Sequence, residues 1–346
     1  MNTPSNPTKP HPRLWVETRS QGLYIKPADC YIDPMRPVDK AIITHGHADH
    51  ARAGHHTVYT TPQTMAIMAC RYGAEHAKHQ HCLSYGEQHV LNGGVCISLY
   101  PAGHILGSAQ VLVEYQGSRL VVSGDYKRRY DPTCCGFTPV PCDVFVTEAT
   151  FALPVFSHPP IESELQRLLH SVAQFPNRCH LIGAYALGKC QRLIVGLRDL
   201  GYHQPIYLHG ALVKLCELYQ DWGIELGEWL KVSEVADKQS LAGAIVLAPP
   251  SALADKWSRT LPDVLTGMAS GWLQIRARSK QRRVELPLVI SDHCDWPELL
   301  QTLEDVNAPE IWVTHGREQA LVYQAKRLGY RASALSLLGY GEDEHE

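Results

Sequence analysis

The chain has 346 residues and a formal net charge of −3, with 45% hydrophobic and 19% charged residues. This composition excludes an intrinsically disordered chain, and the length allows one elaborate domain or two. The net charge excludes a globally basic nucleic-acid-binding protein, so any nucleic acid would have to meet a local positive surface. Apolar runs of roughly 18 residues, the length of a membrane span, do not occur, so no membrane partner is expected.

The 11 cysteines form no paired C-x-x-C sets of the kind that hold structural zinc. A chain of this length does not depend on disulfides, so we expect free thiols in a reducing cytoplasm, the localisation that we predict. A vicinal disulfide between Cys134 and Cys135 is the alternative. Residues 1–13 lack the apolar stretch of a signal peptide and are expected to form a loose tail.

The first part of the chain, up to residue 147, is predicted to consist of short strands with one helix among them. Apolar and β-branched runs bounded by turn residues indicate the strands. They cover residues 23–25, 30–32, 41–44, 95–100, 109–115, 120–122 and 143–147. The helix covers residues 61–72, with Pro62 in its first turn, where proline is tolerated. Its Met65, Ala69 and Tyr72 are spaced to share one face.

Strands then alternate with helices, which predicts a parallel sheet like that of nucleotide-binding folds. The helices are predicted at 163–175, 188–200 and from 211 onward, and the strands at 179–185, 205–208 and 243–247. After residue 283 the earlier pattern returns, with strands at 286–290 and 310–313 and a helix at 297–303. The layout therefore predicts one fold that is interrupted by an inserted α/β domain.

An H-x-H-x-D-H motif at residues 45–50 directly follows an apolar strand. In extended backbone His45 and His47 point the same way, and after the next turn Asp49 and His50 can face a second position. Imidazole favours zinc, iron or manganese, and carboxylates add oxygen ligands. These four potential ligands within six residues therefore predict a pair of bound divalent cations.

Three more candidate ligands, His104, Asp125 and His315, lie at turns where strands end. A lone histidine at such a position is more often structural or solvated, but the neighbouring cluster favours a ligand role here. Glycines precede His104 and Asp125 and would let the backbone approach the metals closely. Asp125 is suited to bridge two metals because a carboxylate has two oxygens, and His315 can complete the second site.

This motif set resembles the metallo-β-lactamase superfamily, which implies an α/β fold with an αββα sandwich. Asp33, in the string Tyr-Ile-Asp-Pro, is similar to the family's first motif, a buried aspartate that supports the metal-binding loop. The cluster at 45–50 resembles the second motif, His104 the third and Asp125 the fourth. The resemblance thus covers the N-terminal half with every ligand in place.

The second half resembles the β-CASP nucleases within that superfamily. The strings at 147–150, 291–295 and 313–316 are similar to their acidic motif and to the two motifs that follow it. The segment between Glu148 and His293 is where an α/β β-CASP domain belongs. The resemblance implies a first metallo-β-lactamase segment at 1–155, a β-CASP insert at 156–285 and a return segment at 286–346.

Local strings at 123–127, 148–154 and 314–316 are similar to the bacterial ligase-associated DNA exonucleases, as are the length and the short acidic tail. Residues 184–189 resemble the Tyr-x-x-Gly-Lys segment of Artemis-type DNA nucleases. Those eukaryotic enzymes usually lack a histidine at the last motif, whereas this chain has His315, as the RNA-processing branch does. The resemblance implies an ATP-dependent DNA ligase and a helicase as partners in DNA repair.

The resemblance assigns roles to the clustered residues, with two zinc or manganese ions as cofactors. His45, His47, His104 and Asp125 would hold the first ion, and Asp49, His50, Asp125 and His315 the second. Asp49 counts as a catalytic residue together with Glu148 and His293. His293 is the predicted general acid, held and kept charged by Glu148. The alternative for His293 is a residue near a helix start with no proton role.

Two sets of residues are predicted to contact nucleic acid. Lys189 follows a glycine at a strand-to-helix turn, where with Tyr185 it would bind a terminal 5′-phosphate; a surface lysine is the alternative. Arg276, Arg278 and Lys280 alternate, so in a strand they would share a face that could track a phosphate backbone. A solvated basic strand is the alternative for this second set.

The sequence therefore predicts a metal-dependent DNA exonuclease that acts from a 5′-phosphorylated end in DNA repair, on single-stranded or end-containing DNA. A β-CASP ribonuclease is the first alternative, favoured by His315. A small-molecule hydrolase of the superfamily would have no use for Glu148, His293 and a large insert. A catalytically dead binding protein would need a lost ligand, and none is lost.

Overall fold

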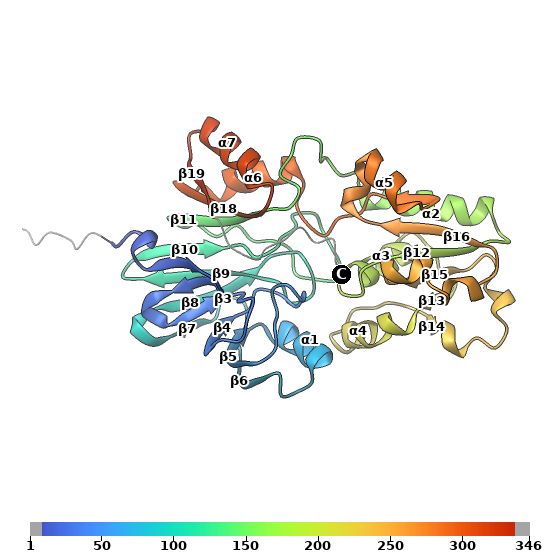
Figure 1. Ribbon diagram of the computed structural model, residues 1–346, viewed down its shortest axis with the longest axis horizontal. Coiled ribbons are helices and arrows are strands. Elements are labelled where there is room, and N and C mark those ends of the chain that lie inside the picture. The colour runs from blue at the N-terminus through green and yellow to red at the C-terminus, as the bar shows by residue number, and fades with distance from the viewer. Residues whose placement is uncertain (1–8, 336–346) are drawn as a thin grey trace, which may run out of the picture.

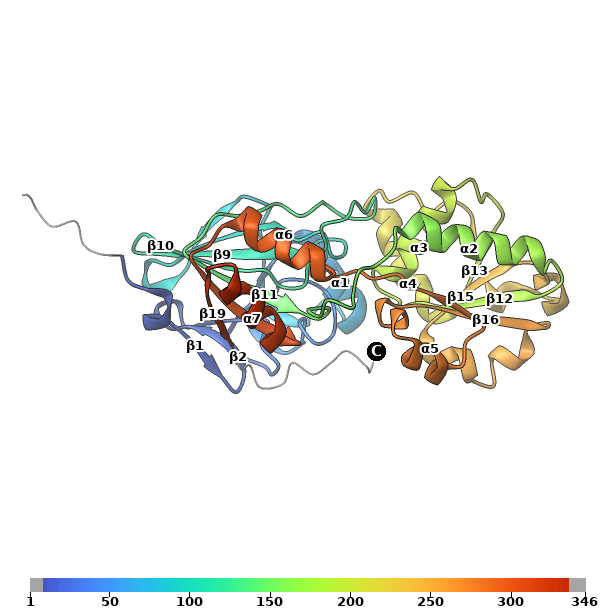
Figure 2. The same cartoon turned by 90° about the horizontal axis from the view of Figure 1, so that it is seen from above.

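The computed structural model describes residues 9–335, which form three sheets flanked by helices (Figure 1). The predicted loose tail up to residue 8 and the acidic tail at the chain end lie outside the described residues. Figure 2 shows two lobes, one built from the first two sheets and the other from the third. No helix within residues 9–335 is long and apolar enough to cross a bilayer. All 11 cysteines lie in this part of the chain as free thiols.

The first sheet is built entirely from the N-terminal segment, in the order of the sequence. Its strands are β1 (Val16–Arg19), β2 (Gly22–Ile25), β3 (Cys30–Ile32), β4 (Lys40–Ile42), β5 (His55–Thr60) and β6 (Ala77–Cys82). The first three strands pair antiparallel and the remaining pairs are parallel. The helix predicted at 61–72 is confirmed as α1 (Pro62–Tyr72), with Thr61 as N-cap, whose hydroxyl accepts a hydrogen bond from the Thr64 amide.

The second sheet joins strands from both ends of the chain, in the order β19-β18-β11-β10-β9-β8-β7. Its strands are β7 (Gln88–Val90), β8 (Cys96–Pro101), β9 (Ala109–Tyr115), β10 (Ser118–Val122), β11 (Val144–Ala149), β18 (Glu310–Gly316) and β19 (Arg331–Ala334). The helices α6 (Trp296–Val306) and α7 (Glu318–Arg327) accompany the last two strands. Because β11 pairs in parallel with β18, the chain re-enters this sheet beside the strand from which it left.

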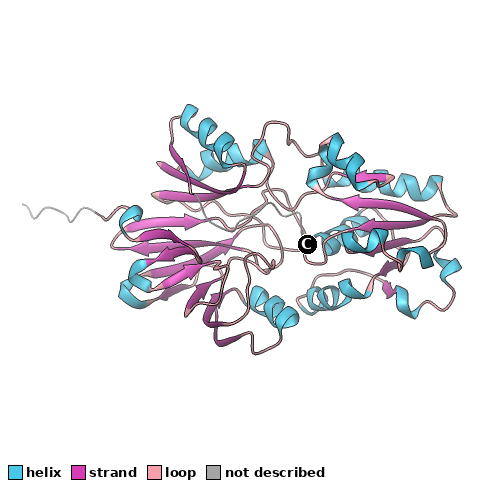
Figure 3. Ribbon diagram, viewed as in Figure 1, coloured by secondary structure: helices cyan, strands magenta, loops and turns pink. Residues whose placement is uncertain are grey.

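The first two sheets pack face to face over one apolar core, to which Ile25 and Ile42 of the first and Val111 and Val146 of the second belong. A second cluster joins the outer face of the first sheet to α1, and a third joins the outer face of the second sheet to α6 and α7. Figure 3 shows these helices outside the two sheets. Burial of one apolar face of each element gives the helix–sheet–sheet–helix order that the resemblance implies.

The inserted part of the chain forms the third sheet, in the order β14-β13-β15-β12-β16-β17, with every pair parallel. Its strands are β12 (Cys179–Gly183), β13 (Ile206–Leu208), β14 (Trp229–Lys231), β15 (Ile245–Ala248), β16 (Val264–Ala269) and β17 (Leu286–Leu288). Its helices are α2 (Ile161–Gln174), α3 (Lys189–Asp199), α4 (Gly210–Asp221) and α5 (Arg276–Arg282). Since β17 pairs with β16, the chain leaves this sheet after Leu288.

The strand predicted for the basic run is wrong, because residues 276–282 form the helix α5. The positive charges alternate along this run, but the run lacks the alternation of apolar and polar side chains that indicates a strand. Arg, Lys, Gln and Ala are all good helix formers. In the helix Arg276 and Lys280, four positions apart, lie on one face, while Arg278 points elsewhere. The Arg278 guanidinium stacks over the Trp272 ring, 4.2 Å from its centroid.

Candidate active site

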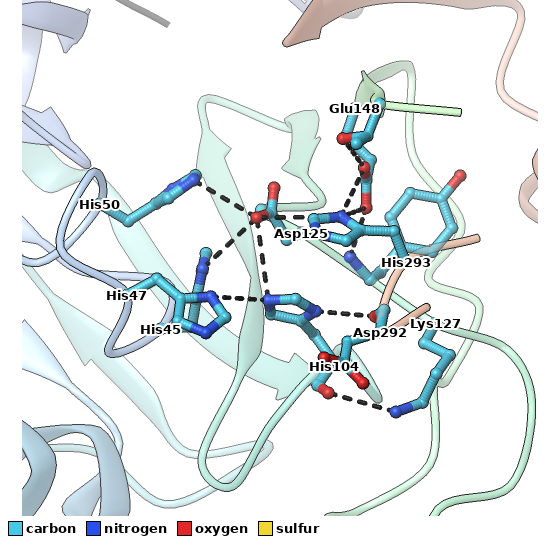
Figure 4. Close-up of polar contacts among 12 residues, drawn as sticks. His45, His47, His50, His104, Asp125, Lys127, Glu148, Asp292 and His293 are labelled. Carbon is cyan, nitrogen blue, oxygen red and sulfur yellow. Dashed lines mark hydrogen bonds and ion pairs between the residues drawn. The ribbon is translucent and has the colours of Figure 1, made fainter. Parts of the chain in front are cut away.

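The clustered residues of the sequence motifs meet where the sandwich faces the third-sheet lobe, on the loops that follow β4, β8 and β10 and at the end of β18 (Figure 4). Ligand atoms of His45, His47, His104 and Asp125 all lie within 4.8 Å of one another. Nε2 of His104 is 2.9 Å from Nδ1 of His47. The structure therefore brings together the four residues that the sequence assigns to a first metal ion.

A second group is formed by Asp49, His50 and His315, whose ligand atoms also lie within 4.8 Å of one another. Nε2 of His50 is 3.4 Å from an Asp49 carboxylate oxygen and 3.5 Å from Oδ2 of Asp125. Oδ2 of Asp125 is also 3.5 Å from Nε2 of His45. Asp125 thus lies between the two groups, as a residue shared by two ions would.

The donor set fits divalent cations. Among residues 9–335, Nε2 of His45 and Oδ1 of Asp125 are buried without a hydrogen-bond partner, an arrangement that is rare unless a ligand supplies the contact. Burial and the neighbouring histidines lower the pKa of His45 and His104 well below its usual value, which favours the neutral imidazole that binds metals. Imidazoles combined with buried carboxylates suit a pair of such ions.

Asp33 ties the start of the metal-binding loop to its end. Its carboxylate accepts hydrogen bonds from the amide and the hydroxyl of Thr44, at 2.8 and 2.6 Å, and contacts Nδ1 of His50 at 2.7 Å. Because Nδ1 of His50 is held in this way, the opposite ring nitrogen is directed at Asp49 and Asp125. This geometry agrees with the prediction that Asp33 holds the metal-binding loop in place.

Asp33→Asn is expected to destabilise the fold by about 2 kcal/mol and to lower metal content, because an amide cannot accept from both Thr44 groups and His50. Urea unfolding and elemental analysis would measure the two effects. Asp29→Asn is the matched control, since Asp29 is exposed and also has a positive φ; its cost should stay within roughly 0.5 kcal/mol. Equal stability and metal content in both variants would contradict the role.

Two glycines beside predicted ligands allow the backbone to pass close to neighbouring groups, as the sequence predicts. A Cβ on Gly103 would lie 2.2 Å from the Lys127 carbonyl oxygen, and one on Gly124 would lie 2.8 Å from the Thr44 side chain. Both glycines also have positive φ, at 76° and 56°. The turns that present His104 and Asp125 therefore require glycine for both space and backbone conformation.

The half-buried His293 and the buried Glu148 form a pair beside the first ligand group. Nδ1 of His293 lies 2.9 and 3.1 Å from the two Glu148 carboxylate oxygens, which also accept from the Tyr126 amide and the Thr150 hydroxyl. Burial would raise the pKa of Glu148, but His293 and these hydrogen bonds lower it, so the carboxylate is ionised. The N-cap of α6 is Asp295, so His293 lies in the preceding loop and is not the helix start.

A pocket joins the two lobes at this point. Its lining includes His47, Asp49 and His293 from the sandwich side, with Tyr185, Lys189 and Trp272 from the third-sheet side. Lys189 is the first residue of α3 and is only 4% exposed, so the alternative of a surface lysine is wrong. Its Nζ lies 3.3 Å from Oδ2 of Asp292 and 4.8 Å from the Tyr185 ring centroid.

Comparisons with known proteins give relatives of larger size. No protein-family model matches the chain. A protein of Opitutus terrae named "Probable DNA ligase" is 28% identical over 344 residues, which are 95% of this chain and 31% of that protein. A protein of Neurospora crassa named "Endoribonuclease ysh-1" is 30% identical over 231 residues, 54% of this chain and 27% of that protein. The chain thus spans less than a third of each of these two relatives.

One solved structure, of a protein of unknown function from Enterococcus faecalis V583, matches 80% of this chain and 75% of its own with a TM-score of 0.53. At 13% identity this likeness is one of fold alone. The curated relatives and the complete set of clustered ligands together decide the assignment. The chain belongs to the metallo-β-lactamase/β-CASP family.

The two strands of the second sheet that flank the insert, β11 and β18, bring two of the β-CASP motifs together. The strand β11 ends in Glu148 and Ala149, and its parallel partner β18 ends in His315 and Gly316. A Cβ on Gly316 would lie 2.4 Å from the Ala149 carbonyl oxygen, so the two strand ends approach closely. The β-CASP acidic motif and the last motif are therefore neighbours in space although the whole insert separates them in the sequence.

The basic run, which the sequence predicts could track a phosphate backbone, lies on α5. Arg276 and Lys280 are exposed on α5, and neither lines the pocket. Trp272 lines this pocket and contacts Arg278 of the same helix.

Sequence reasoning missed a set of buried charges next to the site. Asp292 directly precedes His293 in the motif at residues 291–295, and this position is the one signal that could have identified Asp292. Burial would raise the pKa of Asp292, but Lys189, Lys127 and Arg192 lower it below its usual range. Asp292 is therefore a buried, ionised carboxylate beside the predicted phosphate-binding lysine.

Proposed function

We propose that the protein is a metal-dependent DNA exonuclease that hydrolyses phosphodiester bonds from a 5′-phosphorylated end. The observation that carries this proposal is the shared pocket, in which the buried lysine Lys189 faces the predicted metal ligands His47 and Asp49. A terminal phosphate at the lysine would place the following phosphodiester towards the ligands. The relative that is similar over 95% of this chain is named a probable DNA ligase, which supports DNA as substrate.

We assign each step to side chains of the two ligand groups and to the His293–Glu148 pair. His45, His47, His104 and Asp125 would hold one ion, and Asp49, His50, Asp125 and His315 the other. When bound, such ions lower the pKa of a water molecule and neutralise phosphate charge. Nδ1 of His293 contacts Glu148, and we assign to this imidazole the transfer of a proton to the leaving oxygen.

The protein partners that we propose are an ATP-dependent DNA ligase and a helicase, in bacterial DNA repair. The support for the ligase is the similarity to a probable DNA ligase, of which this chain covers 31%. The remainder of that relative leaves room for a joining activity in the same polypeptide. An exonuclease that trims ends would prepare the phosphorylated ends that a ligase joins.

A β-CASP ribonuclease is the second candidate. It is favoured by His315, which completes the second ligand group, and by a 30% identical relative named an endoribonuclease. A small-molecule hydrolase is less favoured, because it would have no use for the Glu148–His293 pair and a buried lysine in the same pocket.

A cleavage assay with manganese-loaded protein tests the proposal. Single-stranded DNA with a 5′-phosphate, the same DNA with a 5′-hydroxyl and matched RNA would be compared, with Asp49→Ala as the blank. Stepwise trimming of the phosphorylated DNA is expected. Cleavage of RNA with DNA spared would replace the proposal by the second candidate.

Lys189→Ala is expected to lower kcat/KM on 5′-phosphorylated DNA by roughly tenfold to a hundredfold, the worth of one hydrogen bond to a charged group. The rate on 5′-hydroxyl DNA should change little, because that end makes no such contact. Lys256→Ala is the matched control, since Lys256 is an exposed lysine on the same lobe. A Lys189→Ala enzyme that still prefers 5′-phosphate ends would refute the assignment.

A further inference from the structure

Five buried charged side chains form a continuous row beneath the pocket. They are Lys127, Asp131, Arg192, Asp292 and Lys189, and none of these side chains is more than 5% exposed. The first two follow β10, the two cations on α3 belong to the third-sheet lobe, and Asp292 lies in the loop that returns to α6. The row therefore crosses from one lobe to the other.

The members of this row alternate in sign along their contacts. Nζ of Lys127 lies 2.5 Å from the Asp131 carboxylate, which in turn lies 3.4 Å from Nε of Arg192. Nη1 of Arg192 is 3.2 Å from Oδ1 of Asp292, and the other oxygen of Asp292 is 3.3 Å from Nζ of Lys189. Each carboxylate thus joins two cations, and the Arg192 guanidinium joins the two carboxylates.

The row carries one more positive than negative charge, because three cations meet two carboxylates. A buried charge without a counter-charge is costly, so this arrangement favours the arrival of an anion. Lys127 closes one end of the row, where its Nζ donates to the His104 carbonyl oxygen. Lys189 forms the other end of the row and lines the pocket, so the excess positive charge can attract an anion there.

Asp292 connects this row to a predicted metal ligand through its own backbone. Its carbonyl oxygen accepts a hydrogen bond from Nδ1 of His104 at 2.8 Å, as Figure 4 shows. The other ring nitrogen of His104 then faces His47 in the first ligand group, at 2.9 Å. One residue therefore fixes both the His104 ring, through its carbonyl, and the Lys189 ammonium group, through its carboxylate.

Arg192 holds this residue in place from the other lobe. Its Nη1 donates to the Ser291 carbonyl oxygen at 2.5 Å as well as to Asp292, while its Nε faces Asp131. These contacts use the rigid fork of a guanidinium, which a lysine ammonium group cannot reproduce. Arg192→Lys therefore keeps the charge of the row and removes its geometry.

We propose that Arg192 and Asp292 are positioning residues that hold the Lys189 ammonium group at a fixed place relative to His104, and thereby set selectivity for a DNA end that carries a phosphate. This inference rests on the proposed function for the identity of the ligand. Neither residue is assigned a contact with the reacting atoms; both act through Lys189.

The test measures binding of an uncleavable single-stranded DNA with phosphorothioate linkages to the full-length, manganese-loaded protein. The same DNA with a 5′-phosphate or a 5′-hydroxyl is compared, so the ratio of the two dissociation constants isolates the terminal phosphate. Arg192→Lys, which keeps the charge of the row, is expected to reduce this ratio about tenfold, the loss of one charge-assisted contact, with the 5′-hydroxyl affinity unchanged. Asp292→Asn is expected to reduce the ratio by less, because the lost carboxylate also makes the row more positive. Arg178→Lys, in a surface ion pair with Glu285, is the matched control and should keep the ratio.

The outcomes separate this inference from the proposed function. A wild-type protein that binds both ends equally, or variants that weaken both ends in proportion, would overturn the inference even if the protein cuts DNA. Loss of the ratio in the variants, with metal content unchanged, would support it even if no DNA is cut, in which case the proposed function alone fails. If Asp292→Asn does not fold, Arg192→Lys decides the question by the same ratio.

Discussion

Asp125→Ala is expected to lower metal content and to reduce activity by on the order of 10²- to 10³-fold or more, the range for losing one group that stabilises charge in a transition state. Asp125 belongs to the first ligand group, and its Oδ2 also lies 3.5 Å from Nε2 of His50 in the second. Elemental analysis together with the DNA cleavage assay would measure the two effects.

Asp143→Asn is the matched control, because Asp143 lies just before the start of β11, where it accepts a hydrogen bond from the Arg119 amide away from the ligands. It should keep metal content and activity. Asp125→Asn separates charge from shape, since the amide is the same size but lacks a second oxygen and the negative charge. If Asp125→Ala retained its full complement of metal, Asp125 would not be a shared ligand.

His293→Ala is expected to lower kcat by about 10²- to 10⁴-fold, the usual contribution of a positioned proton donor, while metal content stays unchanged. The physical reason is that the alkoxide that leaves from DNA needs a proton. A nitrophenyl phosphodiester releases nitrophenolate, a stable anion that needs no proton, so the variant should hydrolyse this substrate at close to the wild-type rate. Comparing the two substrates therefore isolates proton donation from every other role.

The structure offers one competing role for His293, which the same variant resolves. Ligand atoms of His293, Glu148 and Asp125 lie within 4.8 Å of one another, so His293 could itself hold a metal ion. Loss of metal in His293→Ala would establish that role and remove the general acid. Equal loss of rate on DNA and on the nitrophenyl ester would also rule out His293 as the general acid. Glu148→Gln keeps a hydrogen-bond acceptor but not the charge, and should fall between wild type and His293→Ala.

The sequence predicted secondary structure well where one local pattern dominates. The helix α1 has a proline in its first turn and an apolar face, and both features lie within 11 residues. The strand β6 was missed because five of its six residues are exposed, which leaves no apolar alternation to detect. The strand β16 was missed although most of it is buried, because it contains Gly267, whose missing side chain makes room for Ile182.

The sequence by itself predicted which side chains cluster as candidate metal ligands, because the motif at residues 45–50 places four of them within six residues after a buried strand. It could not determine the row of charges from Lys127 to Lys189. A lysine or arginine in a sequence is most often a surface residue, and its burial depends on partners that lie far along the chain, as Arg192 and Asp292 do. Only the tertiary structure, by placing the inserted lobe against the sandwich, decided that these charges meet.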